Sequence, residues 1–193
     1  MTHSLTRRHT LALLAAGAYA PSAAIAEGAA QGIPTPGAEI VLELSDGKST
    51  FRAEQLRGKW ALVFFGYMSC PDVCPMTLFD IARVLRLLGT SADKVVAVFI
   101  SVDPERDDVT RLRDYVSSFD ARIVALSGPA ERIAKSAASF GVSYYKISGA
   151  TPTDYTIAHS AFISLVGPEG GILGRYSTET APEEFVSKLR KLI

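Results

Sequence analysis

Cys70 and Cys74 are the two cysteines of this chain, and they are the residues best suited to chemistry. They stand four positions apart in the segment YMSCPDVCP, which follows a continuous apolar run and precedes a helical pattern. On a helical turn, four residues correspond to about 6 Å of rise and place both sulfurs on one face. Such a pair can form a disulfide, carry out thiol–disulfide exchange, or bind one soft metal ion.

The spacing of the cysteines disfavours a structural disulfide but does not decide between thiol–disulfide exchange and metal binding. A disulfide that closes so short a loop constrains the unfolded chain little, which disfavours a purely structural bond. A helix N-terminus lowers the pKa of a thiol and favours the thiolate that redox exchange and metal binding both need. Three intervening residues, in place of the two of the thioredoxin redox motif, favour a metal. The pair alone still leaves redox and metal chemistry open.

The N-terminal segment has the three parts of an export signal. Arg7 and Arg8 precede an uncharged apolar run at residues 11–20, and the small-residue site Ala24-Ile25-Ala26 follows it. The apolar run is shorter than the roughly 20 residues that a membrane-spanning helix needs. We therefore expect residues 1–26 to be a secretory signal peptide. The protein would then be periplasmic or otherwise exported, and membrane-anchored if the segment is retained.

Removal of this signal would simplify the composition. The full chain has 20 basic and 20 acidic side chains and three histidines, whereas residues 27–193 keep 18 basic and 20 acidic side chains, both cysteines and one histidine. Neither the full chain nor residues 27–193 has the excess of basic side chains that favours binding to nucleic acid, so we expect no nucleic-acid partner. Residues 27–37 are rich in small residues, glycine and proline, which is typical of a linker. Residues 38–193 are long enough for one domain with its own core.

His159 is the one histidine that would remain after export. It stands 85 residues beyond Cys74, directly before an apolar run at residues 161–166. A sulfur pair needs a third ligand to close a copper site, and sulfur combined with imidazole suits copper. A lone histidine at a strand edge is more often a surface or structural residue. The chemistry of His159 alone therefore leaves both interpretations open.

The elements that must position these residues alternate along the chain. Asp46-Gly47 between two short apolar runs predicts an N-terminal hairpin. Strands alternate with helices first, and a hairpin and a helix come last, which predicts an α/β sandwich with a mixed central sheet flanked by helices. The expected strands are 61–67, 95–102, 123–126, 143–147, 161–166 and 171–176, and the expected helices are 78–88, 107–118, 129–140 and 182–192.

A compact charged turn, Asp103, Arg106 and Asp107, follows the second buried strand. We interpret it as a structural ion pair combined with helix capping, and partner recognition is the second interpretation.

Three segments together resemble the signatures of the Sco/SenC family. They are YMSCPDVCP at residues 67–75, SVDPERD at residues 101–107, and Asp154-Tyr155 followed by His159. The resemblance covers residues 34–193. It implies a thioredoxin-like fold in which Cys70, Cys74 and His159 bind one copper ion. Ala158 stands where the family usually has an acid, a departure that changes the surroundings of the histidine and leaves the three ligands in place.

The resemblance also implies a function. Members of the family are copper chaperones of cytochrome oxidase assembly, which implies a protein that binds Cu(I) or Cu(II) and delivers it to the binuclear copper centre of cytochrome c oxidase. Its partners would be the copper-bearing oxidase subunit, a thiol reductant and another copper carrier. The alternative is an enzyme, a thiol–disulfide oxidoreductase that reduces the cysteines of that subunit, with Cys70 attacking and Cys74 resolving. We expect the chaperone, which is not an enzyme.

Overall fold

The apolar runs of the sequence form the centre of the fold. The computed structural model describes residues 39–151 and 154–193, which belong to one compact unit. The expected signal peptide and linker lie outside the described residues. Within the described part of the chain, no helix has both the length and the apolar character needed to cross a membrane.

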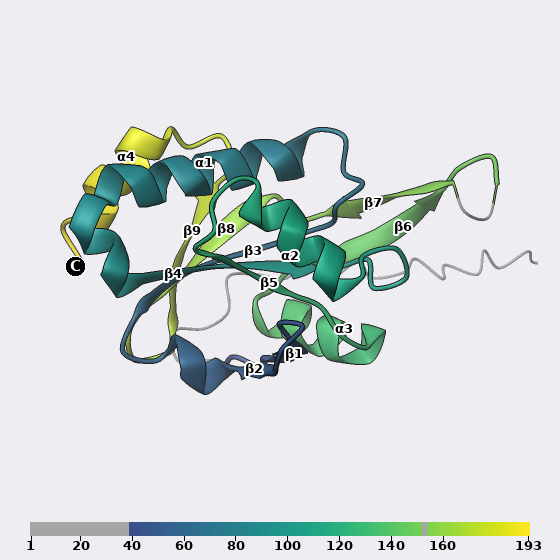
Figure 1. Cartoon of the computed structure of the whole chain (residues 1–193), viewed down its shortest axis with the longest axis horizontal. Coiled ribbons are helices and arrows are strands. Elements are labelled where there is room, and N and C mark those ends of the chain that lie inside the picture. The colour runs from purple at the N-terminus through teal and green to yellow at the C-terminus, as the bar shows by residue number, and fades with distance from the viewer. Residues whose placement is uncertain (1–38, 152–153) are drawn as a thin grey trace, which may run out of the picture. The chain divides into compact units, whose positions relative to one another are not determined.

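A five-stranded mixed sheet has the order β5-β4-β3-β8-β9 (Figure 1). Strands β3, β4 and β5 are parallel, β8 is antiparallel to β3, and β9 is antiparallel to β8. This arrangement confirms the predicted mixed sheet. The strands are β3 (Trp60–Gly66), β4 (Val95–Ser101), β5 (Ile123–Leu126), β8 (Phe162–Val166) and β9 (Ile172–Ser177).

Helices cover both faces of this sheet. Helices α1, α2 and α4 lie on one face, and α3 lies on the other together with the hairpin of β1 and β2 (Figure 1). Gly47 closes the turn of this predicted hairpin with a φ of 84°, a conformation that glycine adopts without strain. The elements are α1 (Val73–Leu88), α2 (Val109–Ser117), α3 (Ala130–Ser139), α4 (Pro182–Leu189), β1 (Glu43–Ser45), β2 (Thr50–Arg52) and the 3₁₀ turns Ala53–Leu56 and Gly89–Lys94.

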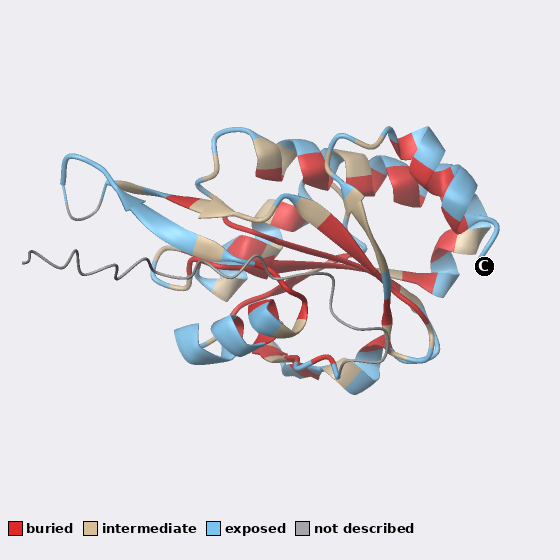
Figure 2. Ribbon diagram, turned by 180° about the vertical axis from the view of Figure 1, so that it is seen from behind, coloured by how far each residue is buried: buried red, intermediate tan, exposed pale blue. Residues whose placement is uncertain are grey.

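Strand β3 is buried from Ala61 to Gly66 because helices cover it from both sides. Its neighbouring aromatic residues point to opposite faces, since side chains alternate along a strand. The ring of Phe64 lies 5.8 Å from Phe99, whereas the ring of Phe65 lies 5.4 Å from Phe140 at the end of α3. Buried residues accordingly concentrate in the central strands and on the inner sides of the helices (Figure 2).

A second hairpin, β6 (Tyr144–Ser148) and β7 (Tyr155–His159), forms a separate two-stranded sheet. It extends away from the five-stranded sheet (Figure 1). The sequence predicts β6 but no strand between residues 148 and 160, so the prediction around His159 is wrong. Most side chains of the hairpin are exposed or half-buried. A strand without a continuous apolar run or a clear alternation of burial gives little signal in a sequence.

Candidate metal centre

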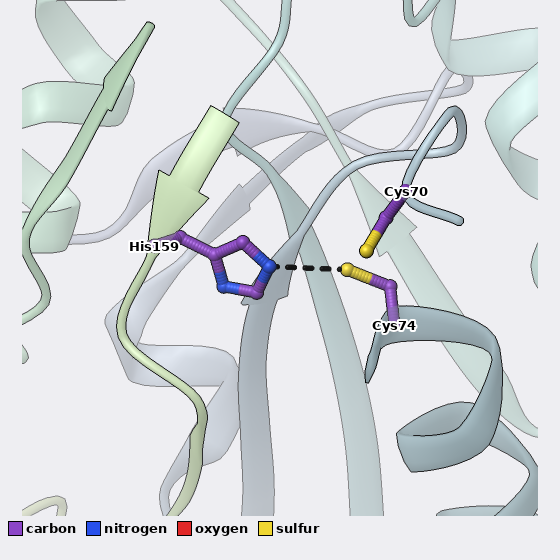
Figure 3. A group of neighbouring side chains, drawn as sticks. All are labelled: Cys70, Cys74 and His159. Carbon is purple, nitrogen blue, oxygen red and sulfur yellow. Dashed lines mark hydrogen bonds between the residues drawn. The ribbon is translucent and has the colours of Figure 1, made fainter. Parts of the chain in front are cut away.

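Three side chains that could bind a metal ion meet at one end of the sheet. One donor atom from each of Cys70, Cys74 and His159 lies within 4.8 Å of the other two (Figure 3). In the described part of the chain, no other group of three or more histidine, cysteine or acidic side chains has this arrangement. The structure thus brings together all three residues that the sequence singles out.

The two cysteines lie on different kinds of backbone. Cys70 lies in the loop between β3 and α1, where its N–H donates to the carbonyl of Tyr67 at 3.4 Å. Helix α1 begins at Val73, so Cys74 lies in its first turn and Cys70 precedes it. The expectation that one helical turn carries both sulfurs is therefore wrong, because only Cys74 lies in the helix. The loop, and not the helix, brings Cys70 to the site.

Asp107 anchors this loop from the segment between β4 and α2. Its Oδ2 accepts hydrogen bonds from the N–H of Met68, at 3.0 Å, and from the hydroxyl of Ser101, at 2.6 Å. The residue that caps α2 is Asp108, whose side chain accepts from the N–H groups of Thr110 and Arg111. The sequence predicts capping by the turn of Asp103, Arg106 and Asp107, whereas the cap is the next residue, Asp108.

Gly66 makes room for the buried thiol. A Cβ atom at this position would lie 2.7 Å from Sγ of Cys74 and 2.9 Å from the ring of Phe99. Both distances are shorter than atoms in a packed interior allow. The last residue of β3 therefore has to lack a side chain for Cys74 to occupy its present position.

His159 is the last residue of β7 and pairs with Tyr144 of β6. Its ring packs edge-on against Tyr67, with centroids 5.9 Å apart, and against Phe64, with centroids 6.0 Å apart. Nδ1 lies 3.1 Å from the carbonyl oxygen of Ser160. Because a carbonyl oxygen only accepts, Nδ1 carries the proton and Nε2 presents its lone pair. Nε2 lies 3.2 Å from Sγ of Cys74.

Burial decides the protonation of both groups. It lowers the pKa of His159 below 6.5, against the opposing effect of the hydrogen bond to Ser160. Burial likewise raises the pKa of the Cys74 thiol. The expectation that the helix N-terminus lowers this pKa is wrong for Cys74, because the cost of placing a thiolate in a buried site is larger. The metal-free site therefore contains a neutral imidazole that accepts a hydrogen bond from a neutral thiol.

The charged turn after β4 forms the predicted ion pair. Nε of Arg106 lies 2.5 Å from Oδ2 of Asp103. Tyr155, which no local pattern singles out, completes this group, since its hydroxyl donates to Oδ1 of Asp103 at 2.7 Å. The place of Tyr155 in the third signature segment was the only signal for it. Ala158 pairs with Tyr145 across the hairpin and, by strand alternation, points to the face opposite His159.

The donor set limits which metal fits. Two sulfurs and one imidazole nitrogen are soft ligands, which suit copper, and the group contains no carboxylate oxygen of the kind that magnesium or calcium prefers. Three ligands also leave a coordination position open to an incoming group.

Comparison with known proteins supports this assignment. The sequence profile described as SCO1/SenC matches residues 41–193. The mitochondrial SCO2 homologue of Mus musculus is 37% identical over 139 residues, which cover 71% of this chain and 54% of the mouse protein. A protein of Stutzerimonas stutzeri that is named for copper binding is 32% identical over 177 residues, covering 88% of this chain and 86% of that protein. The match thus spans about half of the mouse relative and most of the bacterial one.

Solved structures agree with the sequence relatives. ScoI of Bradyrhizobium japonicum, determined with copper bound, superposes with a TM-score of 0.74 at 39% identity, covering 84% of this chain and 100% of that one. ScoI of Arabidopsis thaliana, also with copper bound, gives a TM-score of 0.73 at 31% identity, covering 83% and 97%. The likeness confirms the thioredoxin-like fold with its N-terminal hairpin. The chain therefore belongs to the SCO1/SenC family.

Proposed function

We propose that this protein is an exported copper chaperone, not an enzyme, that holds one copper ion on Cys70, Cys74 and His159. It delivers the ion to the binuclear copper centre of cytochrome c oxidase. The observation that carries the proposal is the convergence of the three soft donors within 4.8 Å, from segments 85 residues apart. The copper-bound structures of two relatives support the choice of metal.

The site has the properties that a carrier of copper as cargo needs. The lone pair of Nε2 already faces the site, so the imidazole can bind copper without losing a proton. Binding by Cys74 requires its thiol proton to leave, which ties copper affinity to pH. Cys70 is only half-buried, whereas Cys74 is buried. An acceptor ligand can therefore approach from the side of Cys70 before the ligands of this chain release the ion.

The first experiment tests the ligand set. Reduced wild-type protein and the His159→Ala variant are titrated with Cu(I) without oxygen, in competition with a chromogenic chelator. Wild type should bind one copper per chain, and the variant should bind at least about 10-fold more weakly because one ligand is lost. Thr156→Ala is the matched control, since Thr156 is exposed on the same strand. Undiminished binding by His159→Ala would refute the proposed ligand set.

The second experiment tests delivery. Copper-loaded protein is mixed with the soluble copper-bearing domain of the oxidase subunit, kept reduced by a thiol reductant, and the visible absorption of a binuclear copper centre is followed. Transfer that depends on Cys70 and Cys74 supports the chaperone function. We also propose that a second copper carrier loads this protein.

A thiol–disulfide oxidoreductase is the second candidate, and one observation favours it. Cys70 is half-buried while Cys74 is buried, an asymmetry that suits an attacking thiol and a resolving thiol. In this reaction the thiolate of Cys70 would attack a partner disulfide, and Cys74 would then displace the reduced partner. The His159→Ala variant separates the two functions. A redox role predicts little change in the reduction potential of the dithiol, whereas the copper role predicts loss of affinity.

A further inference from the structure

Three side chains, Asp103, Arg106 and Tyr155, connect the far end of the hairpin that carries His159 to the turn after β4. We call Asp103, Arg106 and Tyr155 the clamp. Tyr155 begins β7 and His159 ends it. At about 3.3 Å per residue, the two side chains lie on the same face of the strand roughly 13 Å apart. The clamp therefore does not reach the copper ligands themselves.

The contacts of the clamp form a closed triangle. Nη1 of Arg106 donates to the backbone carbonyl of Tyr155 at 2.8 Å, and its guanidinium carbon lies 3.6 Å from the centre of the Tyr155 ring. The Tyr155 hydroxyl donates to one oxygen of Asp103, and Nε of Arg106 donates to the other. The Asp103 side chain is fully buried and that of Arg106 is 26% exposed. A buried, charge-assisted group of this kind holds its geometry better than a surface ion pair.

The backbone joins the hairpin to the five-stranded sheet at its base, where two residues separate β7 from β8, but no strand of that sheet pairs with β6 or β7. Strands β6 and β7 pair with each other and belong to no larger sheet. A slip of one residue along β7 would turn His159 to the opposite face of the hairpin. Between the clamp and the histidine, the N–H of Ile157 donates to the hydroxyl of Tyr67 at 3.2 Å. Contacts at Tyr155 and Ile157 therefore help to fix the direction of β7. The exposed ion pair of Lys146 on β6 with Glu105, at 2.6 Å, adds a weaker surface contact.

We infer that Asp103, Arg106 and Tyr155 are positioning residues for copper binding, which fix β7 so that Nε2 of His159 faces the two cysteine sulfurs before the ion arrives. The inference rests on the proposed function. Its physical basis is that a ligand already held in place loses little conformational entropy when the metal binds. Without the clamp the hairpin would explore other orientations, and the lost order would have to be restored on binding.

The test must separate positioning of His159 from general stabilisation of the fold. Tyr155→Phe removes only the hydroxyl that donates to Asp103 and leaves the ion pair with Arg106 intact. Arg106→Leu removes the guanidinium and is the stronger change. Tyr145→Phe is the matched control, because Tyr145 lies on the same hairpin with 64% of its surface exposed. Each substitution is made in the wild-type protein and in the His159→Ala variant.

The probe is Cu(I) in competition with a chromogenic chelator, without oxygen. In the wild-type background we expect an affinity loss of about 10- to 100-fold for Arg106→Leu, the range found when the support of a metal ligand is removed. Tyr155→Phe removes one hydrogen bond worth about 1 kcal/mol and should lose about 3- to 10-fold. In the His159→Ala background the same substitutions should change affinity by less than about 2-fold, because the group on which they act is gone. Tyr145→Phe should bind as wild type does in both.

Two results would overturn the inference. One is wild-type affinity in Tyr155→Phe. The other is an equal loss in both backgrounds, which would mean that the clamp stabilises the fold or the cysteine loop without acting through His159. If Arg106→Leu leaves Asp103 buried without its partner and fails to fold, Tyr155→Phe alone decides. If His159→Ala itself binds copper as wild type does, the proposed ligand set fails, and that outcome is read before the clamp variants are compared.

Discussion

The sulfur of Cys74 lies 3.2 Å from Nε2 of His159, although 85 residues separate the two along the chain. In the metal-free protein this contact is a hydrogen bond from the thiol to the imidazole. We propose that the same two atoms bind copper. Without copper, the thiol and the imidazole nitrogen satisfy each other's hydrogen-bonding capacity. A buried donor and a buried acceptor are thus not left unpaired when copper is absent.

The lowered pKa of His159 predicts how metal-free stability depends on pH. The unfolded chain binds a proton on this imidazole near pH 6.5, whereas the buried side chain binds it only at lower pH. The resulting stability is present above about pH 6.5 and is lost as the pH falls through the folded pKa. Reduced, metal-free protein should therefore lose stability between about pH 7 and about pH 5 in urea unfolding.

His159→Gln is the comparison for this prediction, since glutamine does not titrate. The fall in unfolding free energy over the same pH range should be smaller in the variant than in wild type. Equal falls in the two proteins would show that other groups cause the acid sensitivity.

The unequal burial of the two cysteines predicts selective alkylation. Cys70 is half-buried, whereas Cys74 is buried and burial raises the pKa of its thiol. Because the thiolate is the reacting species, iodoacetamide at mildly alkaline pH should modify Cys70 first. Peptide mass spectrometry of the reduced, metal-free protein would identify the site. Denaturant should remove the difference, and equal labelling of the two cysteines in the folded protein would contradict the buried position of Cys74.

Any larger residue at Gly66 should destabilise the fold. In Gly66→Ala the new Cβ would lie 2.7 Å from Sγ of Cys74, so the thiol or the Phe99 ring has to move. Such overpacking costs about 1–3 kcal/mol. Urea unfolding measures the loss, and Gly174→Ala in strand β9 is the control because no atom lies within 4 Å of its added Cβ. A Gly66→Ala protein as stable as that control would show that the space beside Cys74 is larger than we describe.

The hydroxyl of Tyr67 should contribute to stability through one buried hydrogen bond. It accepts from the N–H of Ile157, and both residues are buried. Tyr67→Phe leaves this N–H without its partner, which costs about 1–3 kcal/mol. Thermal or urea unfolding gives the difference. Tyr176→Phe is the control, since its ring stays stacked on Phe185 with centroids 4.0 Å apart. If the two variants lose equal stability, the bond to Ile157 contributes nothing specific.

Prediction from the sequence is most successful where the physical signal is local. Continuous apolar runs predicted the buried strands, and Asp46-Gly47 predicted the first hairpin, because burial and turn geometry select those residue types directly. It failed at β7, whose side chains are largely exposed or half-buried, and at the cap of α2, which the structure assigns to Asp108. The expected lowering of the Cys74 pKa is also wrong, because the spacing of a motif carries no information about how deeply its residues are buried.

The sequence by itself determined which atoms are available: two sulfurs in one short segment, one histidine beyond the expected signal peptide, and a charged turn behind a buried strand. Only the tertiary structure decided what they do together. The β6–β7 hairpin brings His159 to the cysteines, the carbonyl of Ser160 selects the tautomer with a free Nε2, and burial keeps thiol and imidazole neutral. The physical reason is that coordination and desolvation depend on distances in space, which packing sets and separation along the chain does not.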